Sequence, residues 1–161
     1  MRYKRTLFLC YAAIIAALYF VLTLLCSALG ISSGVIQIRL SEMLCILPIF
    51  TSSAIPGLTV GCFFSNLYAG AIWQDYVFGS IATLIGAIGA RALRRFPTLA
   101  PLPTVLANML IIPFVLSYGY GVPDGIPFMI LTVGVGELIS AYILGYILYR
   151  ALKNRAGFLE L

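Results

Sequence analysis

Long apolar stretches alternate with short polar, proline or glycine breaks along most of this 161-residue chain. Apolar runs of about 20 residues match the length that an α-helix needs to cross a bilayer core. The pattern predicts six membrane spans. Their expected limits are Thr6–Ser27, Arg39–Thr51, Ala54–Ile72, Tyr76–Leu93, Pro101–Ser117 and Ile126–Tyr149. The second span is too short for a full crossing, so we expect it to be tilted or to continue as an irregular outer segment buried in protein.

The composition supports a membrane protein. The chain is 62% hydrophobic and 9% charged, whereas ordinary soluble domains are roughly 25% charged. We therefore expect an all-α integral membrane bundle with one domain over residues 1–155. Residues 156–161 do not resemble the preceding helix and are interpreted as a tail or an added remnant.

The basic residues predict the orientation. Nine of the ten lysines and arginines flank the apolar runs, and six crossings would place all nine on one side. By the positive-inside rule this side is cytoplasmic, so both termini are expected there. The nine are Arg2, Lys4, Arg5, Arg91, Arg94, Arg95, Arg150, Lys153 and Arg155. This placement argues against nucleic-acid binding, although the net charge is +5.

Several kinds of catalytic machinery are missing from the sequence. There is no histidine, no cluster with metal-ligand spacing and no glycine-rich phosphate loop. We therefore expect no enzyme activity, no metal and no cofactor, and ATP hydrolysis would have to come from partner proteins. The four cysteines are expected to be small buried apolar residues.

Glu137 is the clearest candidate for a binding residue. It lies about 11 residues, or roughly 16 Å, into the sixth span. A carboxylate at membrane depth is costly unless it faces a wet cavity or a partner, which favours a functional role. Asn108 and Asn66 are polar residues in neighbouring spans, where interhelical hydrogen bonding is the alternative role. Together these residues predict a polar pocket that opens outward.

Further candidates lie on the expected outer side. Asp75 and Glu42 supply carboxylates, and Gln37 could cap the pocket. Arg39 lies one helical turn from Glu42, so a local ion pair is the alternative to a binding role. Trp73 could stack on a flat ligand, although an interfacial aromatic belt explains most outer aromatic residues.

Small residues give the first span two smooth rows. Ala12 and Ala16 form one row, and Ala13 and Ala17 form the other. Such rows allow close approach of a second helix, either within the bundle or from a partner protein.

These features resemble a known family. The alanine-rich first span, AAIIAALY, is similar to that of substrate-binding S components of energy-coupling factor (ECF) transporters. The segments IQIRLSEMLCILPIF, GLTVGCFFSNLYAG and WQDYVFGSIATLIGA resemble the QueT family of queuosine-precursor transporters. The resemblance implies a multi-pass protein of the bacterial cytoplasmic membrane. It also implies that Ala12, Ala13, Ala16 and Ala17 dock onto a T component that carries two ATPases.

The implied substrate is a 7-deazaguanine, such as queuine, queuosine or an earlier precursor. One carboxylate can accept the ring N–H and the exocyclic amine of its base together, and asparagine amides suit the remaining edge. The residues do not indicate which carboxylate reads the base. The alternatives are a self-sufficient secondary transporter, a membrane-embedded enzyme and a scaffold without a ligand.

Overall fold

The computed structural model describes residues 2–31 and 37–154, and within these ranges the chain is helical without a strand. The all-helical fold expected from the sequence is therefore confirmed for these residues. The elements are α1 (Arg2–Ala28), η1 (Leu40–Ile49), α2 (Ala54–Tyr68), α3 (Trp73–Ala92), α4 (Leu102–Phe114), η2 (Val115–Gly119), α5 (Ile126–Glu137), η3 (Leu138–Leu144) and α6 (Gly145–Leu152). The tail 156–161, Arg155 and part of the expected outer loop 28–38 lie outside the described residues.

The expected short second span is a 3₁₀ helix, η1. Its ten residues extend over about 20 Å at the 3₁₀ rise of about 2.0 Å per residue, compared with about 15 Å for an α-helix. Pro48 lies inside it and donates no backbone hydrogen bond. Most of η1 is buried, and it packs against α1, α3, α6 and η3. An interior position with protein on several sides explains how this short, irregular helix is accommodated.

Within the part of the chain that the structure describes, three helical stretches are long and apolar enough to cross a membrane. They are Tyr3–Ala28, Leu102–Gly119 and Ile126–Leu152, and η1 is a shorter apolar helix. These stretches support a membrane protein. The topology with six crossings and cytoplasmic termini stays a prediction.

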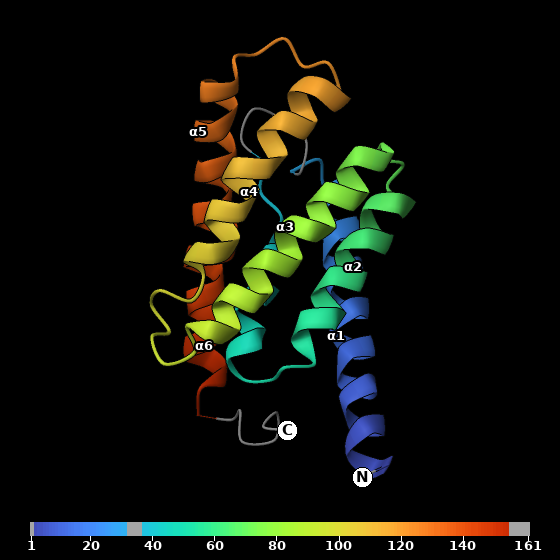
Figure 1. The fold of residues 1–161 in the computed structure, drawn as a ribbon, viewed down its shortest axis with the longest axis vertical. Helices are drawn as coiled ribbons and strands as arrows, with labels where there is room; N and C mark the ends of the chain where they lie inside the picture. The colour runs from blue at the N-terminus through green and yellow to red at the C-terminus, as the bar shows by residue number, and fades with distance from the viewer. Residues whose placement is uncertain (1, 32–36, 155–161) are drawn as a thin grey trace.

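The helices are arranged so that the basic segments share one end of the bundle. In Figure 1, α1 begins, α6 ends and the turn between α3 and α4 lies at the lower end of the view. The α2–α3 turn and the connection from η2 to α5 lie at the opposite end. Asp75 lies in the first turn of α3 and Asp124 lies in the connection before α5. Both therefore belong to that opposite end, and charge is segregated along the bundle as the sequence indicates.

The two alanine rows of α1 have different environments. The first row packs inside the bundle, because a Cβ built on Gly57 would lie 2.7 Å from the Ala12 carbonyl oxygen and one on Gly61 would lie 2.9 Å from that of Ala16. Small residues on both helices permit this close approach. Ala13 and Ala17 are exposed. Residues one position apart are rotated by about 100° around a helix, so the second row lies on a different face of α1 from the packed first row.

Candidate functional site

A small polar cavity lies between the extended residues before η1 and the α4 and α5 helices. It has a volume of about 20 Å³, and Ile112 and Val133 complete its lining. Four of the sequence-predicted residues line it, namely Gln37, Arg39, Asn108 and Glu137. The structure therefore brings together half of the predicted binding residues from three distant parts of the chain.

Glu137 is the central acid of this cavity. Its side chain is 8% exposed, and the 4% exposed Asn108 side chain lies near it in the lining of the same cavity. The Oε2 atom of Glu137 is buried without a hydrogen-bond partner among the described residues. A buried carboxylate oxygen without a donor is unfavourable, because it has lost its hydration without compensation. This oxygen is therefore available to a hydrogen-bond donor that enters the cavity.

The backbone around Glu137 has an unusual geometry that helps to form the cavity wall. Glu137 ends α5, and the π-helical segment η3 follows directly; π-helical turns occur frequently at functional sites. A Cβ built on Gly136 would lie 2.2 Å from the Gln37 carbonyl oxygen, so the extended chain lies directly against α5. The Arg39 backbone N–H donates to the Ser140 hydroxyl at 3.1 Å. Gly136 and Ser140 thus hold Gln37 and Arg39 at the cavity.

Glu42 belongs to a second, fully engaged polar cluster. It is 2% exposed, and it accepts hydrogen bonds from the Tyr19 hydroxyl and, at 3.2 Å, from the Cys45 thiol. Both carboxylate oxygens therefore have partners, and these partners replace the local ion pair with Arg39 that the spacing allowed. Arg39 remains within electrostatic range of Glu42.

Asp75 and Asn66 lie in a third cluster beside Gly79. A Cβ built on Gly79 would lie 3.3 Å from Asn66 Nδ2 and 3.6 Å from Asp75 Oδ1. The Tyr120 hydroxyl donates to Asp75 Oδ2 at 2.9 Å. Burial raises the pKa of Tyr120, and the Asp75 carboxylate raises it further, so this hydroxyl stays protonated at neutral pH. Neither Asp75 nor Asn66 is part of the described lining of the Glu137 cavity.

Trp73 does not join these residues. Its side chain is 58% exposed and contacts Phe78, with ring centroids 6.4 Å apart. The structure places it at the surface, as in an interfacial aromatic belt. No described aromatic side chain lines the Glu137 cavity.

Sequence reasoning missed Tyr19 and Gly136. Tyr19 is 1% exposed although it lies in the middle of an apolar helix, and a tyrosine at that depth needs a hydrogen-bond partner for its hydroxyl. This requirement could have identified Tyr19 in the sequence as a residue that hydrogen-bonds to another helix. Gly136 carried no comparable signal, because its role depends on the approach of a chain segment about 100 residues away.

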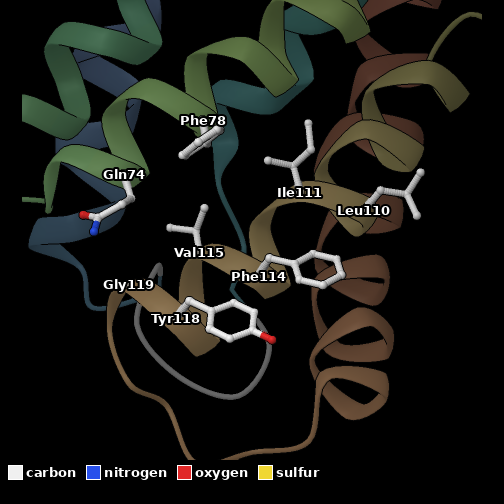
Figure 2. A pocket seen from close by; sticks show the side chains of 8 residues that line it. All are labelled: Gln74, Phe78, Leu110, Ile111, Phe114, Val115, Tyr118 and Gly119. Atoms are coloured by element: carbon white, nitrogen blue, oxygen red, sulfur yellow. The ribbon is translucent and has the colours of Figure 1, made fainter.

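A wider pocket elsewhere has the wrong chemistry for a polar ligand. Its volume is about 390 Å³, and it lies between α3 and the α4–η2 stretch (Figure 2). Its lining is mostly apolar, and several of these side chains are exposed, including Phe78, Leu110 and Phe114. Exposed apolar side chains on membrane helices are typical of a lipid-facing surface. The described residues also contain no group of three histidine, cysteine or acidic side chains that could hold a metal ion.

Comparison with known proteins agrees with the membrane character of the apolar helices. The family model described as QueT transporter matches residues 9–154. A Queuosine precursor transporter QueT from Lactococcus lactis subsp. cremoris (strain MG1363) is 38% identical over 97 residues. This alignment covers 60% of the chain and 57% of the relative, so the chain spans less than two thirds of that protein's length. No solved structure matches the chain. The family and this relative are transporters rather than enzymes, and the chain belongs to the QueT transporter family.

Proposed function

We propose that the chain captures a 7-deazaguanine precursor of queuosine from outside the cell and delivers it inward. The observation that carries the proposal is the buried Oε2 atom of Glu137, which has no partner among the described residues and lies in a polar cavity of a QueT-family protein. The relative named as a queuosine precursor transporter supports the substrate class.

Glu137 is the carboxylate that reads the base in this proposal. The ring N–H and the exocyclic amine of a guanine-like base lie side by side and can donate to one carboxylate together. Glu42 is unsuited to this role because Tyr19 and Cys45 already occupy both of its oxygens. Asp75 has one oxygen engaged by Tyr120 and lies outside the cavity lining. In this proposal the amides of Asn108 and Gln37, which line the same cavity, meet the remaining base edge.

Substrate entry requires the cavity to widen. Its volume of about 20 Å³ is far below the roughly 300 Å³ of common small-molecule sites. Gln37 and Arg39 belong to the extended segment 37–39, whereas the other described lining residues of the cavity belong to the helices α4 and α5. In the proposed mechanism this segment moves away from α5 to admit the base and then returns to cover it.

We further propose that the chain acts as the S component of an ECF importer, docked on a T component and two ATPases. Only 17% of the apolar membrane-spanning stretch of α1 is buried inside the bundle, compared with 39% of the corresponding stretch in each of the other two candidate spans. The exposed row of Ala13 and Ala17 lies on this peripheral helix and suits close approach of a partner helix. In this arrangement the chain crosses the membrane six times with both termini in the cytoplasm.

The experiment measures ligand binding to the purified full chain in detergent. Queuine and its base precursors are expected to bind, whereas unrelated vitamins such as biotin are not. The isosteric substitution Glu137→Gln removes the charge and one acceptor oxygen, so deazaguanine affinity is expected to fall at least about tenfold, equivalent to about 1.4 kcal/mol. A thermal unfolding curve for the same variant checks that the fold is kept.

Two results would contradict the proposal in different ways. Unchanged affinity in Glu137→Gln would remove Glu137 from the site. Gradient-driven uptake by the chain alone in proteoliposomes would replace the S-component role with that of a self-sufficient secondary transporter.

A further inference from the structure

A second cavity adjoins the Glu137 cavity on its outer side. It has a volume of about 100 Å³ and shares Gln37 and Val133 with the first cavity. Asp124 contributes the one carboxylate of its lining, and Thr132 contributes a hydroxyl. The apolar part of the lining comes from Leu116, Val122, Phe128 and Met129. The two cavities are therefore neighbours, and Gln37 of the extended segment lines both of them.

The second cavity extends along α5 from the middle of the bundle toward the outer connection. Val133 is one turn before Glu137, Met129 is about one turn earlier, and Asp124 lies in the connection that precedes α5. Roughly 16 Å of helix separates the first residue of α5 from Glu137. Glu137 ends this helix and Asp124 lies two residues before its first residue, so a bicyclic base with a short arm that lies along α5 would meet an acid at each end.

The charges around the two cavities favour a cation. Glu137, Asp124, Glu42 and Asp75 lie on this side of the bundle, and Arg39 is the one basic residue among them. The other described basic residues belong to segments at the opposite end, namely Arg2, Lys4, Arg5, Arg91, Arg94, Arg95, Arg150 and Lys153. An excess of acids beside apolar walls produces a negative potential that attracts positively charged ligands.

Asp124 has no competing partner. Within the described part of the chain it makes no hydrogen bond or ion pair, in contrast to Glu42 and Asp75. Its charge is therefore available to a ligand that occupies the second cavity. The unpartnered Glu137 oxygen in the adjoining cavity supplies the matching contact for the other end of the same ligand.

We propose that the second cavity is the subsite for the arm at position 7 of the base and that Asp124 attracts a protonated amine on that arm. This inference rests on the proposed function, because it needs the base to be held by Glu137. It goes beyond that function by predicting selectivity among 7-deazaguanines. Ligands whose arm carries an ammonium group bind better than ligands with the same base and an uncharged arm.

The test compares 7-aminomethyl-7-deazaguanine with 7-cyano-7-deazaguanine by titration calorimetry on the full chain at pH 7. The wild-type chain is expected to prefer the aminomethyl ligand. Asp124→Asn is expected to weaken binding of this ligand about three- to fivefold, as for an exposed ion pair, and to leave the cyano ligand unchanged. Asp124→Glu keeps the charge and is expected to keep most of the preference. The preference should also decline with added salt, because exposed charges are screened.

The outcomes separate the two proposals. If Asp124→Asn changes both affinities equally or neither of them, the subsite is wrong while the proposed function stands. If the wild-type chain binds neither ligand, both proposals are overturned. If the cyano ligand binds as tightly as the aminomethyl ligand at low salt, the cationic selectivity is refuted directly.

Discussion

Gly136→Ala is expected to destabilise the protein through one specific contact. The added methyl group would start 2.2 Å from the Gln37 carbonyl oxygen. Real Cβ contacts do not come closer than 3.0 Å, so the Gln37 backbone must move by at least 0.8 Å, the difference between these two distances. Because the obstacle is backbone rather than a flexible side-chain end, the strain cannot be relieved by a rotamer change.

The expected magnitude follows from two opposing effects. Overpacking of this kind costs about 1–3 kcal/mol, whereas replacing glycine by alanine inside a helix contributes about 1 kcal/mol of stability. We therefore expect a net loss of about 1 kcal/mol in the free energy of unfolding. Deazaguanine affinity is expected to fall as well, because Gln37 and Arg39 line the cavity and move together.

Gly134→Ala is the matched control, two residues earlier on the same helix. Its added methyl group would meet the end of the Met109 side chain, at 2.9 Å from Cε. Methionine side chains adapt readily, so this variant is expected to gain about 1 kcal/mol from helix propensity. The assay is unfolding of both purified variants in the same detergent, followed by ligand titration. Equal stability of the two variants would refute the close packing of Gln37 on α5.

Two further predictions concern α1. Ala17→Trp is expected to abolish cellular uptake but spare ligand binding to the purified chain. Ala16→Trp is the control and is expected to destabilise the fold, because the Ala16 Cα lies 3.1 Å from a Cβ built on Gly61. Wild-type uptake by Ala17→Trp would rule out docking through the row of Ala13 and Ala17. Tyr19→Phe removes a donor from the buried Glu42 carboxylate, so the free energy of unfolding is expected to fall by about 1–3 kcal/mol. Unchanged thermal stability of Tyr19→Phe would show that this hydrogen bond contributes nothing.

The distribution of acids shows where sequence reasoning reached its limit. Glu137 is recognisable as a candidate from its depth in an apolar run, and Glu42 and Asp75 are recognisable from their place on the expected outer side. Position along the sequence did not distinguish them, because each could meet donors from any neighbouring helix. Only the packed structure assigns Tyr19 and Cys45 to Glu42 and Tyr120 to Asp75. Glu137 is left with an oxygen that has no hydrogen-bond partner in the described part of the chain.

The alanine rows of α1 illustrate the same limit. The sequence contains both rows and leaves open whether each faces the bundle or a partner. The structure places Ala12 and Ala16 against the glycines of α2 and leaves Ala13 and Ala17 exposed. This assignment depends on the rotation of α1 about its axis, which is set by its contacts with α2 rather than by its own composition.

By itself the sequence determined the helical membrane class, the approximate limits of the helices, the basic end of the bundle and the buried acid of the cavity. These properties follow from the hydropathy and charge of contiguous residues, which local physics is sufficient to interpret. The tertiary structure alone decided that Gln37 lies against Gly136, that Trp73 lies at the surface and that a second cavity leads to Asp124. Each of these depends on which helix faces meet, and that choice is made by packing between segments far apart in the chain.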